Sequence, residues 1–142
     1  MKKILFFALI GLFALVLLIQ LVPYGRQHAN PPVVQEPQWD SPKTRELVQK
    51  ACFDCHSNET VWLWYSNVAP VSWLVQRDVD EGREKLNFSD WGRAREKDEI
   101  IEVIQEGEMP MPIYLIMHPE ARLTSTEKEA LISGLQATIF GR

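Results

Sequence analysis

This sequence of 142 residues has fewer basic than acidic residues, only two cysteines and little of the alternation that is typical of β-strands. Of its 15 basic residues, Lys2, Lys3 and Arg26 lie within the first thirty positions, which leaves 12 against 19 acidic residues, a net charge of −7. Nucleic-acid binding needs a basic face, and none is apparent, so no nucleic acid is expected as a partner. No convincing period-2 run of β-branched residues occurs, which predicts an all-α fold.

The N-terminal region is unusually apolar. Residues 4–22 are apolar except for Gly11 and Gln20, and at ~1.5 Å per residue a helix of this length spans roughly 28 Å, close to the hydrocarbon thickness of a bilayer. Lysines precede this stretch, so the positive-inside rule places the N-terminus in the cytoplasm. We predict a single-pass anchor over residues 1–23 in a bacterial inner membrane, with the remainder in the periplasm. A cleaved signal peptide is the alternative, but its apolar core would be shorter.

Proline is concentrated after the apolar stretch, at Pro23, Pro31, Pro32 and Pro37. Because proline has no backbone N–H and favours extended conformations, residues 24–40 are predicted to form a semi-rigid stalk. His28 lies in this stalk and is expected to be solvated. The folded domain is expected over residues 41–142.

Four helices are expected in that domain, over residues 42–52, 69–82, 94–106 and from 124 onward. Ser41-Pro42 supplies an N-cap followed by proline at the first helical position. Gly107 is a natural helix stop, and Thr124 to Glu127 has the form of a capping box. Gly134 is a candidate for letting Leu47 or Ala51 approach closely. The positions expected to form apolar faces are Leu47, Val48, Ala51, Val71, Leu74, Val75, Val79, Ile100, Ile101, Ile104, Leu131, Leu135 and Ile139.

The segment Cys52-Phe53-Asp54-Cys55-His56 has the Cys-x-x-Cys-His pattern of c-type haem attachment. Thiols three positions apart reach the two vinyl-derived carbons on one side of a porphyrin, and the imidazole of the next residue falls under the iron. The pattern therefore predicts covalently bound haem c, held by Cys52 and Cys55, with His56 as proximal iron ligand.

Three other readings of these cysteines compete with haem. A disulfide between Cys52 and Cys55 is compatible with an exported protein. A thioredoxin-type thiol pair needs a βαβ pattern, which the sequence lacks. A zinc site could draw on Cys52, Cys55 and His118, but it lacks a second ligand pair.

Met109, Met111, Met117 and His118 are the candidates for the sixth iron ligand. Met109 follows the helix stop at Gly107 and precedes Pro110, so its thioether would lie on a short, stiff loop. We therefore predict Met109, with Met111 as the rival. Met117 is expected to fill the core, and His118-Pro119 to form a turn.

Aromatic residues are frequent between the two expected iron ligands. Their large rings are expected to wall the haem and to fill the core. They are Trp62, Trp64, Tyr65, Trp73, Phe88 and Trp91.

Several separated motifs resemble the bacterial haem-binding domain family of c-type cytochromes, in order and in spacing, over most of residues 40–140. The resemblance implies haem c on Cys52 and Cys55, His56 as proximal ligand, and the methionine of Gly-x-Met-Pro, here Met109, as distal ligand. Met-Pro-Pro is common in this family, whereas this chain has Met-Pro-Met-Pro, which leaves Met111 open. The motifs are Cys-Phe-Asp-Cys-His-Ser-Asn-Glu-Thr, Trp-Leu-Trp-Tyr-Ser-Asn-Val-Ala-Pro-Val-Ser-Trp-Leu, Asp-Val-Asp-Glu-Gly-Arg-Glu-Lys-Leu-Asn-Phe-Ser-Asp-Trp, Gly-Glu-Met-Pro-Met-Pro-Ile-Tyr and His-Pro-Glu-Ala-Arg-Leu.

The sequence thus predicts a small cytochrome c-like domain of about four helices around one haem. An iron closed by histidine and methionine ligands carries electrons, whereas an open position would admit a ligand. The expected function is therefore single-electron transfer between periplasmic and membrane redox proteins. No nucleophile or general-base constellation indicates an enzyme. The alternative function is a haem-based sensor or haem-binding accessory subunit.

Overall fold

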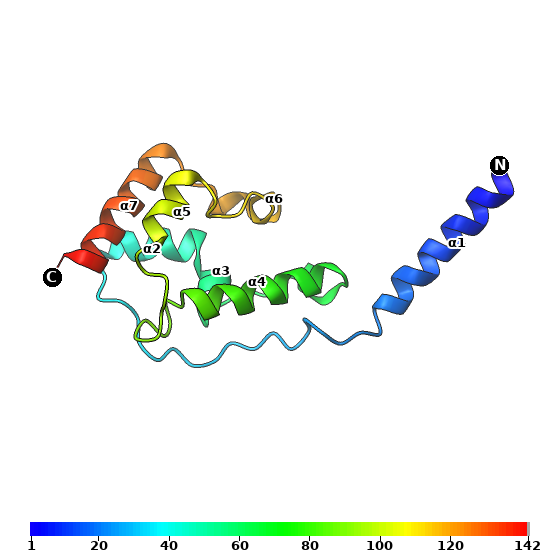
Figure 1. The fold of residues 1–142 in the computed structure, drawn as a ribbon, viewed down its shortest axis with the longest axis horizontal. Coiled ribbons are helices and arrows are strands. Elements are labelled where there is room, and N and C mark those ends of the chain that lie inside the picture. Colours follow the sequence, from blue (N-terminus) through cyan, green and yellow to red (C-terminus); the bar gives the residue numbers. More distant parts are fainter. Residues whose placement is uncertain (142) are drawn as a thin grey trace. The chain divides into compact units, whose positions relative to one another are not determined.

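The computed structural model describes residues 1–141, and these contain helices but no named strand, so the all-α prediction is confirmed (Figure 1). The one β feature in this range is an isolated bridge between Gln35 and Asp90. The helices are α1 (Lys2–Ile19), α2 (Pro42–Ala51), α3 (Phe53–His56), α4 (Val71–Lys85), α5 (Ile100–Glu106), α6 (Tyr114–Met117) and α7 (Ser125–Phe140), with 3₁₀ turns η1 (Trp64–Asn67) and η2 (Pro119–Ala121).

The chain forms two compact units. Unit 1 comprises Met1–Ala29 and Val61–Asp78, and unit 2 comprises Asn30–Thr60 and the chain from Val79 onward. The chain therefore passes between the units at three points along the sequence. The helix α4 contributes residues to both units.

Unit 1 contains α1, which has no buried residue and is long and apolar enough to cross a membrane. The side chain of Gln20, just after α1, pairs with the backbone of Ala69. Its Nε2 donates to the Ala69 carbonyl at 2.9 Å, and its Oε1 accepts from the Ala69 N–H at 3.0 Å. His28 is not solvated as expected, because its ring stacks on Trp62 at 4.7 Å and its Nε2 lies 2.9 Å from the carbonyl oxygen of Ser66.

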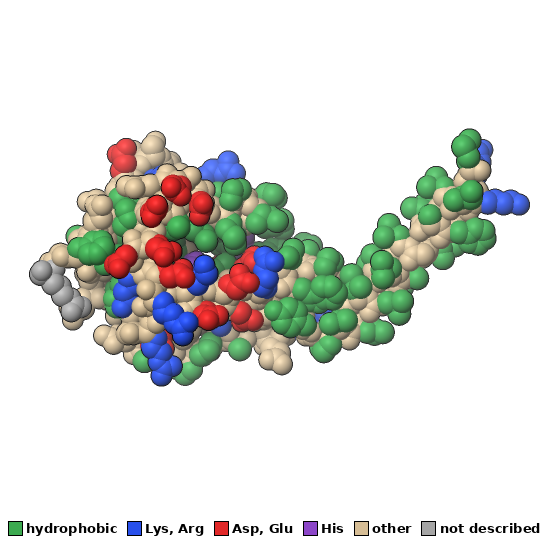
Figure 2. All heavy atoms as spheres, in the orientation of Figure 1, with side chains coloured by type: hydrophobic (Ala, Val, Ile, Leu, Met, Phe, Trp, Pro, Cys, Tyr) green, Lys and Arg blue, Asp and Glu red, His purple; other side chains and the backbone are tan. Residues whose placement is uncertain are grey.

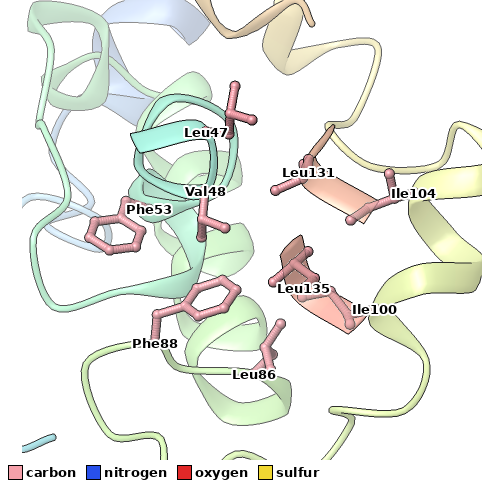
Figure 3. Packing of buried hydrophobic residues seen from close by; sticks show 9 residues of the cluster. All are labelled: Leu47, Val48, Phe53, Leu86, Phe88, Ile100, Ile104, Leu131 and Leu135. Carbon is pink, nitrogen blue, oxygen red and sulfur yellow. The ribbon is translucent and has the colours of Figure 1, made fainter. Parts of the chain in front are cut away.

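Unit 2 has a hydrophobic core to which α2, α5 and α7 contribute side chains. Figure 3 shows Leu131 and Leu135 of α7 between the α5 isoleucines and the α2 side chains. The close approach expected at Gly134 is present: a Cβ at this position would overlap the Thr44 side chain. The expected partners Leu47 and Ala51 are wrong, and Thr44 of α2 is the partner instead. The nine fully packed core members are Leu47, Val48, Phe53, Leu86, Phe88, Ile100, Ile104, Leu131 and Leu135.

The predicted helix starts and stops agree with the structure where they depend on a cap. Ser41 accepts a hydrogen bond from the Thr44 N–H at 3.2 Å, and Thr124 and Glu127 form the capping box. Gly107 ends α5 with a φ of 78°, in the left-handed region that glycine adopts without strain.

Two predicted boundaries and part of one predicted face are wrong. Helix α4 continues past Gly82 to Lys85, and α5 begins at Ile100 rather than near Ala94. Residues 95 and 96 do not extend α5 toward its N-terminus, because their N–H groups donate to the Lys85 carbonyl at 2.9 and 3.2 Å. Val71 and Leu74, expected to face a core, are 41% and 43% exposed.

The proline-rich segment is attached to unit 2 from residue 30 onward. The Val34 and Gln35 N–H groups donate to the Ser89 carbonyl at 2.8 and 3.0 Å, and Asn58 Nδ2 donates to the Pro32 carbonyl at 2.9 Å. Glu36 accepts two hydrogen bonds of 2.7 Å from the Arg45 guanidinium. These contacts hold residues 30–36 against the folded domain, so this part of the expected stalk is not a free tether.

Candidate functional site

The segment of the Cys-x-x-Cys-His pattern forms a tight turn at the end of α2. The Cys52 N–H donates to the Val48 carbonyl at 2.8 Å as the last bond of α2. The His56 N–H then donates to the Cys52 carbonyl at 2.9 Å, which closes the turn α3. Both cysteines are partly buried, and neither is in a disulfide. The turn therefore holds the three predicted ligands of the site, Cys52, Cys55 and His56, within one short stretch of backbone.

The His56 imidazole is fixed through one of its two nitrogens. Nδ1 lies 3.0 Å from the Leu86 carbonyl oxygen and 3.1 Å from that of Gly82. Carbonyl oxygens only accept hydrogen bonds, so Nδ1 carries the proton and Nε2 keeps a lone pair. Burial lowers the pKa of His56, although the two carbonyl hydrogen bonds oppose this shift. The neutral imidazole with an available Nε2 is the form that binds a metal.

The end of α4 packs tightly against the same turn. A Cβ at Gly82 would lie 2.5 Å from the Cys55 carbonyl oxygen and 3.2 Å from the Cys55 Cβ. Only glycine allows the α4 backbone to come this close without displacement. This approach places the Gly82 carbonyl within hydrogen-bonding distance of His56.

The competing readings of the cysteines gain no support from the structure. Burial, and to a lesser extent Cys55, raises the pKa of the Cys52 thiol to about 12, whereas a thiol–disulfide catalyst needs a thiolate. Among residues 1–141 no three His, Cys, Asp or Glu side chains form a group that could hold a metal ion. His118, the third ligand of the zinc reading, is buried beside Glu120, with Nδ1 at 3.1 Å from the Glu120 carboxylate.

The methionine-bearing loop follows α5. The N–H groups of Glu108 and Met109 donate to the Val103 carbonyl at 3.0 and 3.2 Å, and the Met109 side chain packs partly buried against the hydrophobic core of unit 2. Met111 is also partly buried. Met117 was expected to fill the core, and this is wrong, because it is 48% exposed. The turn expected at His118-Pro119 is present, because these residues begin the 3₁₀ turn η2.

One functional contact is missed by the sequence analysis. The Tyr114 hydroxyl donates to the Asp54 carboxylate at 2.7 Å, and the Tyr114 ring stacks on His118 with centroids 4.0 Å apart. Burial, and next the charge of Asp54, raises the pKa of Tyr114, so its hydroxyl stays protonated and donates. Asp54 lies between the two cysteines, so this bond joins the turn of residues 52–56 (the attachment turn) to α6, which follows the loop that carries Met109. The only sequence signal was the position of Tyr114, shortly after Met109.

The aromatic residues expected near the haem separate into two groups. Phe88 is fully buried in the core of unit 2, and Trp91 stacks on it with centroids 5.8 Å apart. Trp62, Trp64, Tyr65 and Trp73 belong to unit 1. Trp64 is 72% exposed, so the expectation that it fills a core is wrong.

These features define a class of protein: an all-helical chain with an N-terminal apolar helix, paired thiols and a neutral histidine ready to bind a metal. A family model described as a haem-binding domain matches residues 14–137. The match covers most of the chain, and the chain belongs to the haem-binding domain family, as the sequence motifs indicated. No curated protein and no solved structure gave a match.

Family membership supports haem as the cofactor, and the residues present fit this group. His56 offers an anchored neutral imidazole with Nε2 available. Cys52 and Cys55 lie on the same turn and form no disulfide. Met109 and Met111 supply thioethers on the loop before α6, and Tyr114 joins α6 to that turn.

Proposed function

We propose that this chain is a membrane-anchored monohaem c-type cytochrome that carries single electrons. Haem c is attached through Cys52 and Cys55, and its iron is bound by His56 and Met109. The observation that carries the proposal is the geometry of His56, whose Nδ1 is held by the backbone carbonyls of Gly82 and Leu86, and which lies on the same turn as two cysteines that form no disulfide. A haem-binding family match over residues 14–137 supports it.

Each cysteine contributes one thioether bond. The Cys52 and Cys55 thiols would hold the porphyrin by adding across its two vinyl groups, with each sulfur bonded to one vinyl carbon and each thiol proton transferred to the other. This addition consumes no oxidant. His56, on the same short segment, would hold the iron through Nε2, because its Nδ1 is bonded to the carbonyls of Gly82 and Leu86.

The bound haem supplies the one-electron change of its iron, and the protein sets the potential and access of that iron. A thioether ligand from Met109 raises the reduction potential relative to a second histidine. We propose electron transfer with periplasmic or membrane redox proteins as the role, rather than an enzymatic reaction. The apolar helix α1 supports attachment to the inner membrane, with the haem-binding unit in the periplasm.

The first experiment expresses the full chain in a bacterial host with c-type cytochrome maturation. We expect a Soret absorbance, and a polypeptide mass that includes haem after denaturation. Cys52→Ala with Cys55→Ala removes both thioether bonds, so haem must then be extractable. A chain that matures without haem, or that releases its haem on denaturation with both cysteines intact, contradicts covalent attachment.

The second experiment identifies the distal ligand and separates two functions. Met109→Ala is expected to remove the methionine-to-iron charge-transfer band of the oxidised protein, while Met111→Ala leaves the band in place. An electron carrier with methionine bound resists carbon monoxide in its ferrous form. Ready binding of carbon monoxide by the unsubstituted protein would instead favour a haem-based sensor or accessory subunit.

A further inference from the structure

A long uncharged segment lies in unit 1 and contains none of the predicted haem ligands. Residues 61–76 contain no Asp, Glu, Lys or Arg, although charged residues make up 24% of the chain. The segment includes Trp62, Trp64 and Trp73, three of the five tryptophans. It forms the turn η1 and the first turns of α4. Its composition differs from that of the acidic remainder.

Large apolar side chains of this segment are exposed. Trp64 is 72% exposed and Val61 is 63% exposed, and Val68, Val71 and Leu74 are each between 41% and 43% exposed. Exposed clusters of this size are uncommon on a soluble surface and indicate an interaction site. In Figure 2, hydrophobic side chains predominate over the first turns of α4 and over the visible face of α1. Every predicted haem ligand belongs to unit 2, whereas this segment belongs to unit 1.

The segment is joined to the residues that follow the apolar helix. Gln20, directly after α1, makes two hydrogen bonds to the backbone of Ala69. A Cβ at Gly25 would overlap the Ser72 carbonyl, so the chain after α1 also lies close against the start of α4. Leu21 and Tyr24 are 78% and 49% exposed between these two contacts. The exposed apolar surface therefore continues directly from the end of α1.

We infer that the exposed side chains of residues 61–74 dock onto the lipid bilayer at the level where α1 leaves it. This inference rests on the proposed anchoring by α1. Tryptophan and tyrosine favour the boundary between headgroups and hydrocarbon, and an uncharged segment has no ionised side chain to desolvate there. The bonds of Gln20 to Ala69 hold the segment beside the end of the span. The lipid surface then covers the apolar side chains that the protein leaves exposed.

The test uses the full haem-loaded chain in vesicles of phosphatidylcholine and phosphatidylglycerol. The photo-cross-linking residue p-benzoylphenylalanine replaces Trp64 or Val71, each in a separate variant. The control replaces Gln136, an exposed residue of α7 in unit 2. An unchanged haem absorbance spectrum shows that each variant folds. Alkaline extraction of the vesicles measures independently whether α1 is inserted.

We expect α1 to resist extraction, and irradiation to yield lipid adducts at positions 64 and 71 with at least a tenfold excess over position 136. Inserted protein without lipid adducts at positions 64 and 71 overturns the docking but leaves the anchor intact. Adducts to a second protein at these positions also overturn it, in favour of a protein partner. Extraction of the unsubstituted chain at alkaline pH overturns both the anchor and the docking.

Discussion

The contact between Gly82 and the attachment turn makes Gly82→Ala a sharp perturbation of the site. The added Cβ would lie 2.5 Å from the Cys55 carbonyl oxygen and 3.0 Å from the carbonyl carbon. Ordinary van der Waals contact begins at 3.4 Å, so the oxygen contact falls short by about 0.9 Å. Both atoms of Cys55 are backbone, so relief requires α4 or the turn to move. Movement of either lengthens the hydrogen bond from His56 Nδ1 to the Gly82 carbonyl.

The expected magnitude is the difference of two effects. Forcing an extra methyl group into a well-packed site costs about 1–3 kcal/mol. Alanine is favoured over glycine inside a helix by roughly 0.5–1 kcal/mol, which offsets part of this cost. We therefore expect Gly82→Ala to lower the free energy of unfolding by about 0.5–2 kcal/mol. For a domain of this size this lowers the melting temperature by roughly 2–16 °C.

Thermal unfolding of the haem-loaded protein, followed by far-UV circular dichroism, measures this shift. Gly92→Ala is the matched control, because a Cβ there has no neighbour closer than 3.8 Å and glycine has no positive φ. We expect the control to melt within 2 °C or so of the unsubstituted protein. Equal melting temperatures for the two variants, with unchanged haem spectra, would refute the close packing of α4 on Cys55.

Three further predictions address other contacts. Tyr114→Phe removes the donor to Asp54, and we expect a loss of about 1–2 kcal/mol in denaturant unfolding; no loss would mean that the bond is unimportant. Lys50 and the Thr124 backbone lower the pKa of Glu127 from 4.5 to about 2, so this pairing stabilises the fold above pH 4.5 and the benefit is lost between pH 4.5 and 2. Glu127→Gln should lack that pH-dependent component, and an unchanged acid profile contradicts this. Ser41→Ala removes the α2 N-cap and should cost about 1 kcal/mol, with exposed Ser133→Ala as a neutral control.

The sequence predicts those features whose determinants lie within a few residues. Ser41 caps α2 through Thr44, and Thr124 and Glu127 satisfy each other at the start of α7. Gly107 ends α5 because glycine tolerates the positive φ that this stop requires. The Cys-x-x-Cys-His turn belongs to the same group. Each of these signals consists of residues a few positions apart and depends on no tertiary contact.

The sequence does not predict contacts between residues that are far apart along the chain. The bond from Tyr114 to Asp54 joins residues sixty positions apart, and no local pattern indicates it. Residues 95 and 96 satisfy their N–H groups with the Lys85 carbonyl, which is why α5 starts later than its apolar period suggests. Helical spacing shows that Val71 and Leu74 share a face, but it does not show what covers that face.

The two sides of the candidate haem site differ in how the protein holds them. His56 is held by two backbone carbonyls of α4 and the residue after it, so a side-chain substitution at Leu86 leaves that acceptor in place. The segment that follows the Met109 loop contacts the attachment turn through side chains: the Tyr114 hydroxyl donates to Asp54, and His118 Nδ1 lies 3.7 Å from the same carboxylate. The backbone N–H of Met109 donates to the Val103 carbonyl. Backbone acceptors thus fix the imidazole, whereas side chains join the methionine-bearing segment to the turn. In the proposed site, a substitution at Met109 would therefore change the distal ligand and leave the anchoring of His56 in place.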